Sequence, residues 1–195
     1  MWKLLIGLFL VCSTSLTAEL KVLAFSGSLR QDSVNTKLVT EAAYLAEKQG
    51  ADVTVVNLRD YPIPFYDADL ETQEGMPIKA RELRRLMIES DIVMIASPEY
   101  NGSVTAVLKN FLDWASRKEE GGPSREAFKE KTFILMSGSP GSGGGARGLV
   151  HLRDIISNIG GSVATTQVVV PYAYEPLDEE KQKELEQLIK PLIVP

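Results

Sequence analysis

The chain is poor in the residues that build cross-links and metal sites. Among its 195 residues it has one cysteine, Cys12, and one histidine, His151. One cysteine excludes a disulfide within the chain, and the pair cannot supply the ligands of a soft-metal centre. A catalytic triad would have to use His151, and no G-x-S-x-G nucleophile elbow is present. These exclusions favour a redox or binding function that depends on a bound cofactor. We therefore predict no metal site and no catalytic side chain.

Positive charge is also scarce. The formal net charge is −5 and the isoelectric point is near 5.1. Proteins that wrap nucleic acid need a basic surface, because neutralising phosphates supplies most of their affinity. Nucleic acid is therefore not an expected partner. With 44% hydrophobic residues, the chain has enough apolar surface for one packed core, so we expect a single globular domain.

Long hydrophobic runs are missing as well. The longest leading run, residues 4–11, follows Lys3 and precedes small residues that end before Glu19. This layout is typical of a secretory signal peptide, and the run falls short of the roughly 20 residues that span a bilayer. We therefore expect a signal peptide over residues 1–18, a folded domain over residues 19–195, an exported or periplasmic location, and no stable membrane span. An apolar first strand is the alternative.

The rest of the chain alternates strand-like and helix-like segments. Strands are predicted at residues 21–25, 53–56, 91–96, 132–136 and 163–170. Helices are predicted from residue 35 to a C-capping Gly50, and at residues 78–89, 104–116, 149–159 and 179–192, with a long loop over residues 60–77. This alternation predicts an α/β fold with a five-stranded parallel sheet between helical layers, in the flavodoxin-like doubly wound order 2-1-3-4-5. Ligands of such folds bind at the carboxyl ends of the strands.

The loop after the first strand combines hydroxyls, an arginine and an Asn-Thr pair. Its candidate ligand-binding residues are Ser26, Ser28, Arg30, Ser33, Asn35 and Thr36. Backbone N–H groups at a helix start attract anions, and a guanidinium adds a forked contact, so the loop is a candidate phosphate cradle. The alternative is an ordinary turn in which Ser33 or Asn35 only caps the helix. No Walker pattern is present, so a nucleoside triphosphate is not indicated.

The segment after the third strand, residues 97–103, is a candidate wall for a flat ring. Pro98 fixes the chain direction, and Asn101 with the following glycine favours a tight turn. Glu99 and Tyr100 lie between them, and the tyrosine can offer a flat surface. The alternative is a turn with a half-buried tyrosine. In the helix that follows, we assign three apolar residues to packing rather than to ligand binding: Phe111, Leu112 and Trp114.

A glycine-rich loop follows the fourth strand. Ser137, Gly138 and Ser139 come first, and glycine there lets the backbone approach a ring or a phosphate closely. Residues 143–148 match G-x-G-x-x-G, but no acidic residue follows at the distance that a ribose contact needs, so we discount a dinucleotide fingerprint. A flexible linker is the other interpretation of this loop. His151 is expected at the surface or an interface.

Taken together, the segments GSLRQDSVNT, SPEYNGS with VLKNFLDW, and GSPGSGGGARGLVHLR resemble the NADPH-dependent FMN reductase family of chromate, quinone and azo-dye reductases. The resemblance runs from about Lys21 to the last strand. It implies noncovalent FMN, NADPH or NADH as co-substrate, and a homodimer or homotetramer. Two features depart from the family: Thr105-Ala106 replaces the Pro-Gly of many relatives, and the relatives are cytoplasmic, which makes a cytoplasmic location the alternative to export.

The resemblance also assigns residues. Ser28, Arg30, Ser33, Asn35 and Thr36 would hold the FMN phosphate, residues 98–101 would border the ring, and residues 137–139 would approach it from the fourth strand. Hydride would pass from the nicotinamide to the flavin and then to a small acceptor such as a quinone, chromate, an azo compound or free flavin. The alternative function is a flavodoxin-type electron carrier without an NAD(P)H site. Such carriers usually have no arginine in the phosphate loop, whereas this loop contains Arg30.

Overall fold

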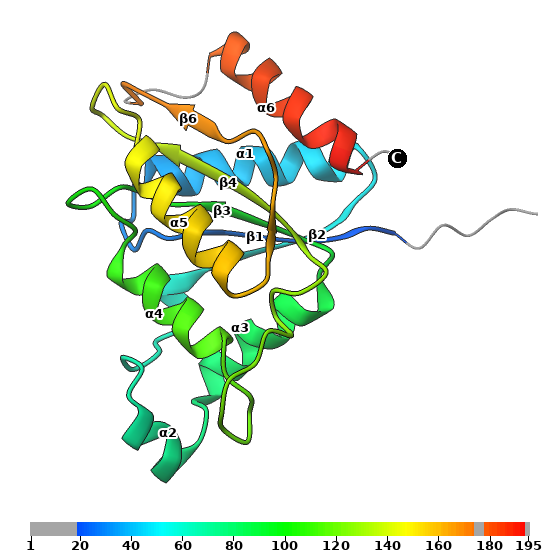
Figure 1. Cartoon of the computed structure of the whole chain (residues 1–195). Coiled ribbons are helices and arrows are strands. Elements are labelled where there is room, and N and C mark those ends of the chain that lie inside the picture. The colour runs from blue at the N-terminus through cyan, green and yellow to red at the C-terminus, as the bar shows by residue number, and fades with distance from the viewer. Residues whose placement is uncertain (1–18, 174–177, 194–195) are drawn as a thin grey trace, which may run out of the picture.

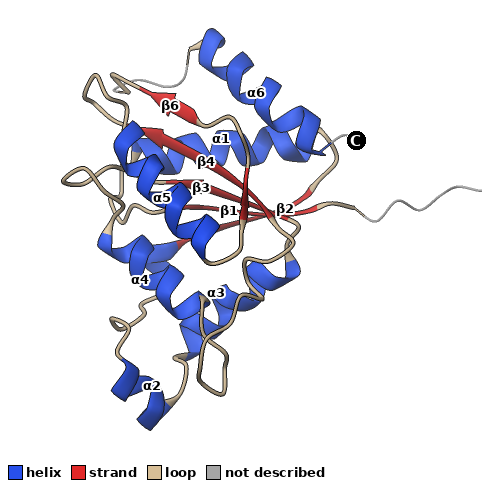
Figure 2. Ribbon diagram, viewed as in Figure 1, coloured by secondary structure: helices blue, strands red, loops and turns tan. Residues whose placement is uncertain are grey.

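The computed structural model describes residues 19–173 and 178–193. The predicted signal peptide, residues 1–18, lies outside the described residues. A twisted parallel sheet forms the centre, with helices on both faces (Figures 1 and 2). Its strands are β1 (Lys21–Ser26), β2 (Asp52–Asn57), β3 (Ile92–Ala96), β4 (Thr132–Gly138) and β5 (Ser162–Val163), in the order β2-β1-β3-β4-β5. The predicted flavodoxin-like order is therefore confirmed.

Alternate residues of the central strands pack against different helical layers. In β3, Met94 lies in a cluster with residues of α1 (Val34–Lys48) and α6 (Glu179–Ile193). Its neighbours Val93 and Ile95 lie in a second cluster with residues of α3 (Ile78–Glu89), α4 (Ala106–Ala115) and α5 (Ala146–Asn158). All five β3 side chains are buried, as a strand covered on both faces requires. Phe111, Leu112 and Trp114 are also buried, so their assignment to packing is confirmed.

Three predicted boundaries were wrong. The predicted loop over residues 60–77 contains the helix α2 (Ala68–Glu74), and a short 3-10 helix, Leu58–Asp60, leads into it. The predicted strand over residues 163–170 is broken into β5 and β6 (Val168–Val170), and both parts pair with β4. Helix α5 begins at Ala146, three residues before its predicted start, with Gly145 at φ +90° as its N-cap residue; its first three residues carry no large apolar side chain that would mark a helix.

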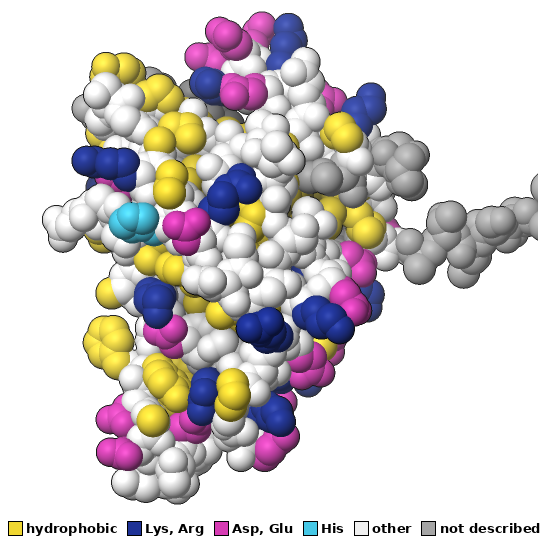
Figure 3. Space-filling view, in the orientation of Figure 1, with side chains coloured by type: hydrophobic (Ala, Val, Ile, Leu, Met, Phe, Trp, Pro, Cys, Tyr) yellow, Lys and Arg dark blue, Asp and Glu magenta, His cyan; other side chains and the backbone are white. Residues whose placement is uncertain are grey.

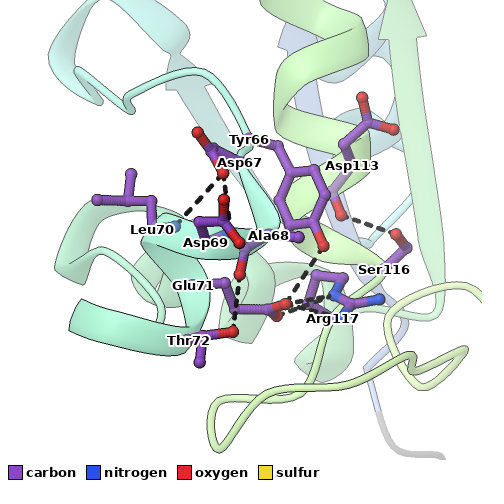
Figure 4. Close-up of polar contacts among 10 residues, drawn as sticks. All are labelled: Tyr66, Asp67, Ala68, Asp69, Leu70, Glu71, Thr72, Asp113, Ser116 and Arg117. Carbon is purple, nitrogen blue, oxygen red and sulfur yellow. Dashed lines mark hydrogen bonds and ion pairs between the residues drawn. The ribbon is translucent and has the colours of Figure 1, made fainter.

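Residues 61–77, which we call the α2 lobe, are held to α4 by polar side chains. The Asn110 side chain accepts from the Tyr66 N–H at 2.8 Å, and the Trp114 indole donates to the Pro64 carbonyl at 2.8 Å. Just beyond α4, Arg117 forms a forked ion pair with Glu71, whose carboxylate also accepts from the Tyr66 hydroxyl (Figure 4). A layer of satisfied polar contacts thus fixes the lobe.

The surface agrees with the composition. Acidic and basic side chains are interspersed over the face drawn in Figure 3, with no basic stripe on it.

His151 is exposed, as expected, and its Nδ1 lies 3.0 Å from the Ser103 hydroxyl. None of the helices in the described part of the chain is both long and apolar enough to cross a membrane.

Candidate functional site

The carboxyl ends of β1, β3 and β4 lie side by side, so the loops that follow them meet at one edge of the sheet. There they line a groove, which we call the carboxyl-edge groove. Its lining residues are Ser28, Arg30, Ser33, Val34, Asn35, Pro98, Glu99, Tyr100, Gly138, Ser139 and Pro140. Three segments that are far apart in the sequence thus form one site. Four predicted site residues do not line it: Ser26, Thr36, Asn101 and Ser137.

The loop after β1 is organised by short hydrogen bonds around the start of α1. The Ser28 hydroxyl accepts from the Arg30 N–H at 3.2 Å, and the Ser33 hydroxyl caps α1 by accepting from the Thr36 N–H at 3.3 Å. The Arg30 side chain is exposed and has no hydrogen-bond or ion-pair partner among the described residues. A helix start, two hydroxyls and a free guanidinium therefore face one groove, which is the donor set that a phosphate group needs.

Asn35 joins two walls of the groove. Its amide NH₂ donates to the Gly138 carbonyl at 2.8 Å, and its amide oxygen accepts from the Gly138 N–H at 2.9 Å. Both ends of the buried amide are thus engaged by the backbone of one residue, Gly138. The contribution of Asn35 to the groove is to hold the start of α1 against the end of β4, rather than to present a free polar group.

The turn after β3 has the conformation that its Asn-Gly pair favours. Asn101 and Gly102 have φ values of +52° and +79°, and Tyr100 and Ser103 exchange backbone hydrogen bonds of 3.0 and 3.1 Å. Two successive residues at positive φ are characteristic of a type I′ turn. The turn leaves the Tyr100 side chain 48% exposed, next to the buried Pro98. The tyrosine ring therefore provides a flat, partly apolar surface at the groove.

Glu99 ties this turn to the start of α5. One carboxylate oxygen pairs with Arg147 at 2.7 Å, and the other accepts from the Gly148 N–H at 3.1 Å. Burial raises the pKa of Glu99, but the hydrogen bonds from Gly148 and Arg147 outweigh it and hold the pKa below its ordinary value of 4.5. The carboxylate is therefore ionised at neutral pH, and it links the turn after β3 to the start of α5. The sequence offers no signal for this pairing.

Two glycines allow the backbone to pack closely around the groove. A Cβ at Gly138 would lie 2.8 Å from the Val34 Cγ1 atom, so a side chain there would push α1 away from β4. A Cβ at Gly145 would overlap the Ser137 hydroxyl, which is fully buried and has no hydrogen-bond partner among the described residues. The two ends of the glycine-rich loop are therefore packed, whereas its middle, residues 141–143, is exposed.

The four predicted residues outside the groove lie next to it. Ser26 and Thr36 line a neighbouring depression beside β2, and the Ser26 hydroxyl accepts from the Ser28 N–H at 3.2 Å. Asn101 occupies the exposed tip of its turn, and Ser137 lies beneath Gly145. Sequence reasoning did not find Val34 and Pro140, which line the groove without polar side chains that would mark them.

The groove suits the phosphate end of a flavin mononucleotide, and the tyrosine-bearing turn suits its ring. Ser28, Arg30 and Ser33 can hold the phosphate, and the absence of a side chain at Gly138 lets the start of α1 lie close to the end of β4 at this groove. Fold and groove together define a flavodoxin-like, FMN-binding protein.

Comparison with known proteins narrows this class. The family profile described as NADPH-dependent FMN reductase matches residues 20–175. An NADPH:quinone oxidoreductase of Arabidopsis thaliana is 36% identical over 142 residues, which cover 73% of this chain and 69% of that protein. A quinone reductase of Escherichia coli K12 is 33% identical over 141 residues, which cover 72% and 71%.

Solved structures of flavoproteins share this fold. The flavoenzyme NAD(P)H:(acceptor) oxidoreductase FerB of Paracoccus denitrificans superposes with a TM-score of 0.71 at 26% identity, over 89% of this chain and 94% of that one. An archaeal flavodoxin superposes with a TM-score of 0.59 at 10% identity, which shows a shared fold only. The chain belongs to the NADPH-dependent FMN reductase family. The predictions of an FMN-dependent oxidoreductase and of NAD(P)H use are confirmed, and the family supports this function over the flavodoxin-type carrier.

Proposed function

We propose that the protein is an NAD(P)H:quinone reductase whose FMN lies in the carboxyl-edge groove. One observation carries the proposal: loops after three different strands bring an anion cradle and a flat, tyrosine-bearing wall to the same groove. Bound FMN supplies hydride and electron transfer, and the protein supplies binding and orientation. Quinones are proposed as acceptors because the relatives from Arabidopsis and Escherichia are named for them.

The predicted site residues then take three kinds of role. Ser28, Arg30 and Ser33 hold the phosphate through a cation, hydroxyls and the start of α1. Pro98, Tyr100 and the Asn101 turn border the ring, and Ser139 approaches it from β4. The remaining residues shape the groove through their packing and hydrogen bonds: Ser26, Asn35, Thr36, Glu99, Ser137 and Gly138.

We also propose that two or four copies assemble. Large apolar side chains are exposed at and beside the α2 lobe: Phe65 is 75% and Ile78 is 70% exposed. Tyr100 of the groove is itself half-exposed, so a neighbouring copy could complete the ring pocket. Sedimentation equilibrium should give a mass of two or four chains, and a monomer at micromolar concentration would contradict this.

The test of the function is the visible spectrum of the FMN-loaded protein without oxygen. On mixing with NADPH, the yellow absorbance should bleach within seconds, and a stoichiometric amount of benzoquinone should restore it. Because donor and acceptor use the same site in turn, steady-state lines should be parallel when the quinone is varied at several NADPH concentrations. A colour that persists with NADPH but bleaches with dithionite would instead identify an electron carrier.

Export is the remaining proposal. It rests on the order of charge, apolar run and small residues in the first 18 residues. N-terminal sequencing of the protein isolated from its native cells should begin near Glu19. A mature chain that begins at Met1 and stays in the cytoplasmic fraction would contradict it.

A further inference from the structure

The side chain of Thr105, just after the turn at residues 100–103, bonds to Gly27, which precedes the groove residue Ser28. Thr105 is 3% exposed, and its hydroxyl donates to the Gly27 carbonyl at 2.6 Å while accepting from the Leu108 N–H at 3.3 Å. The first bond joins residues 78 positions apart, and the second caps α4. One hydroxyl therefore both caps α4, the helix after the turn at residues 100–103, and bonds to the loop after β1.

Gly27 is the first residue of the loop after β1, which carries Ser28 and Arg30. Its N–H donates to the Ala96 carbonyl at the end of β3 at 2.8 Å, so both polar groups of its backbone are engaged. A Cβ at Gly27 would lie 3.0 Å from the Leu108 side chain. The first turn of α4 thus rests directly on this backbone, and a shift of α4 would move the loop that carries Ser28 and Arg30.

Both bonds depend on the Thr105 hydroxyl. In this chain the threonine has a backbone φ of −72° and ψ of 151° and supplies both the helix cap and the link to Gly27.

We propose that Thr105 is a positioning residue that sets the spacing between the phosphate cradle and the ring wall, and thereby the affinity for FMN. The inference rests on the proposed FMN site. Its physical basis is preorganisation: a ligand that contacts two walls binds more tightly when the walls are already held at the right separation. Without the hydroxyl, the buried Gly27 carbonyl loses its donor, and one of the contacts that hold the two walls together is lost.

The test compares Thr105→Val, which keeps the shape, with Thr105→Ser, which keeps the hydroxyl. FMN titration followed by flavin fluorescence should give a dissociation constant raised about tenfold for the valine variant, the size of one lost hydrogen bond. The serine variant should stay within about twofold of wild type. Thr105→Ala provides a second hydroxyl-free variant if the valine variant does not fold.

Asp67→Ala is the matched control, because Asp67 caps α2 by accepting from the Asp69 N–H at 2.8 Å and does not line the groove. It should lower the melting temperature and leave FMN affinity unchanged. The proposal is overturned if hydroxyl-free variants bind FMN as wild type does, or if Asp67→Ala weakens FMN equally. Wild-type protein that binds no FMN would overturn the proposed function as well, which separates the two failures.

Discussion

The α2 lobe and the carboxyl-edge groove use polar side chains in opposite ways. In the lobe, the carboxylate, guanidinium and phenol of Glu71, Arg117 and Tyr66 satisfy one another (Figure 4). In the groove, Arg30 has no side-chain partner among the described residues, and the hydroxyls of Ser28 and Ser33 accept only backbone N–H groups. Polar groups that satisfy each other stabilise a fold, whereas unsatisfied groups at a shared edge are available to a ligand.

Two carboxylates with lowered pKa values, Glu71 in the lobe and Glu99 at the groove, differ in how exposed their partners are. The hydrogen bonds from Arg117 lower the pKa of Glu71, although burial opposes them. Burial also opposes the lowering at Glu99, whose partner Arg147 is 82% exposed. Water screens an exposed partner, so the Glu99 pair contributes less to stability than the Glu71 pair does. Its main effect is to hold the start of α5 next to the turn at residues 100–103.

The largest effect is expected from Glu71→Ala. It leaves the Arg117 guanidinium, whose side chain is 22% exposed, without its partner. Removing one member of a buried pair costs about 3–5 kcal/mol, which urea unfolding should detect as a lowered midpoint. Glu82→Ala removes the half-exposed pair with Lys79 and should cost less than about 1 kcal/mol. The folded Glu71→Ala protein should still bind FMN normally, and a matching loss of FMN affinity would remove the distinction between lobe and groove.

Arg30→Ala should have the converse effect. A charge-assisted hydrogen bond contributes about 1.5–3 kcal/mol, so FMN affinity should fall roughly 10- to 100-fold. The free energy of unfolding without FMN should change by less than about 0.5 kcal/mol, because the exposed side chain contacts no other described polar group. Unfolding in urea and FMN titration of the same preparation check both. A destabilised protein with normal FMN affinity would reverse the roles of the two regions.

Asn35→Asp tests a groove residue whose polar side chain is fully hydrogen-bonded within the protein, as those of the α2 lobe are. The aspartate can still accept from the Gly138 N–H but cannot donate to the Gly138 carbonyl, which leaves a buried acceptor facing a carboxylate. We expect a loss of about 1–3 kcal/mol in unfolding free energy. FMN affinity should fall as well, because α1 and β4 separate. Normal stability with weakened FMN binding would instead make Asn35 a direct phosphate ligand.

The smallest effect is the pH dependence of the lobe. Because the pKa of Glu71 is lowered in the folded protein, its contribution is complete above the ordinary value of 4.5 and is lost as pH falls through the folded pKa. Wild type should therefore lose stability below about pH 4.5 more steeply than Glu71→Gln, which has no proton to bind there. Parallel stability curves in urea from pH 6 to pH 3 would contradict this role of the ion pair.

The sheet could be predicted from sequence because buried parallel strands are continuous apolar runs, and β3 and β4 are of this kind. Helix α2 was missed because its seven residues show no apolar periodicity, although Asp67 and Gly75 are cap signals at its two ends. The break between β5 and β6 is hidden by Thr165 and Thr166, which have high strand propensity. Local pattern thus identifies buried elements better than exposed ones.

The loops of the site could be predicted, but the roles of single residues could not. Asn35 has the same sequence context whether it caps a helix, binds phosphate or holds a strand, and its partner Gly138 lies 103 residues away. The same holds for Thr105 and Gly27, and for Glu99 and Gly148. Long-range backbone contacts of this kind depend on the folded arrangement of the strands.

The most direct measurement is the titration of wild-type protein with FMN and with riboflavin, which differ only in the phosphate. If the loop after β1 is a phosphate cradle, FMN should bind at least about 100-fold more tightly, as several charge-assisted contacts require. Equal affinity for the two flavins would contradict the account, because the groove would then hold only the ring.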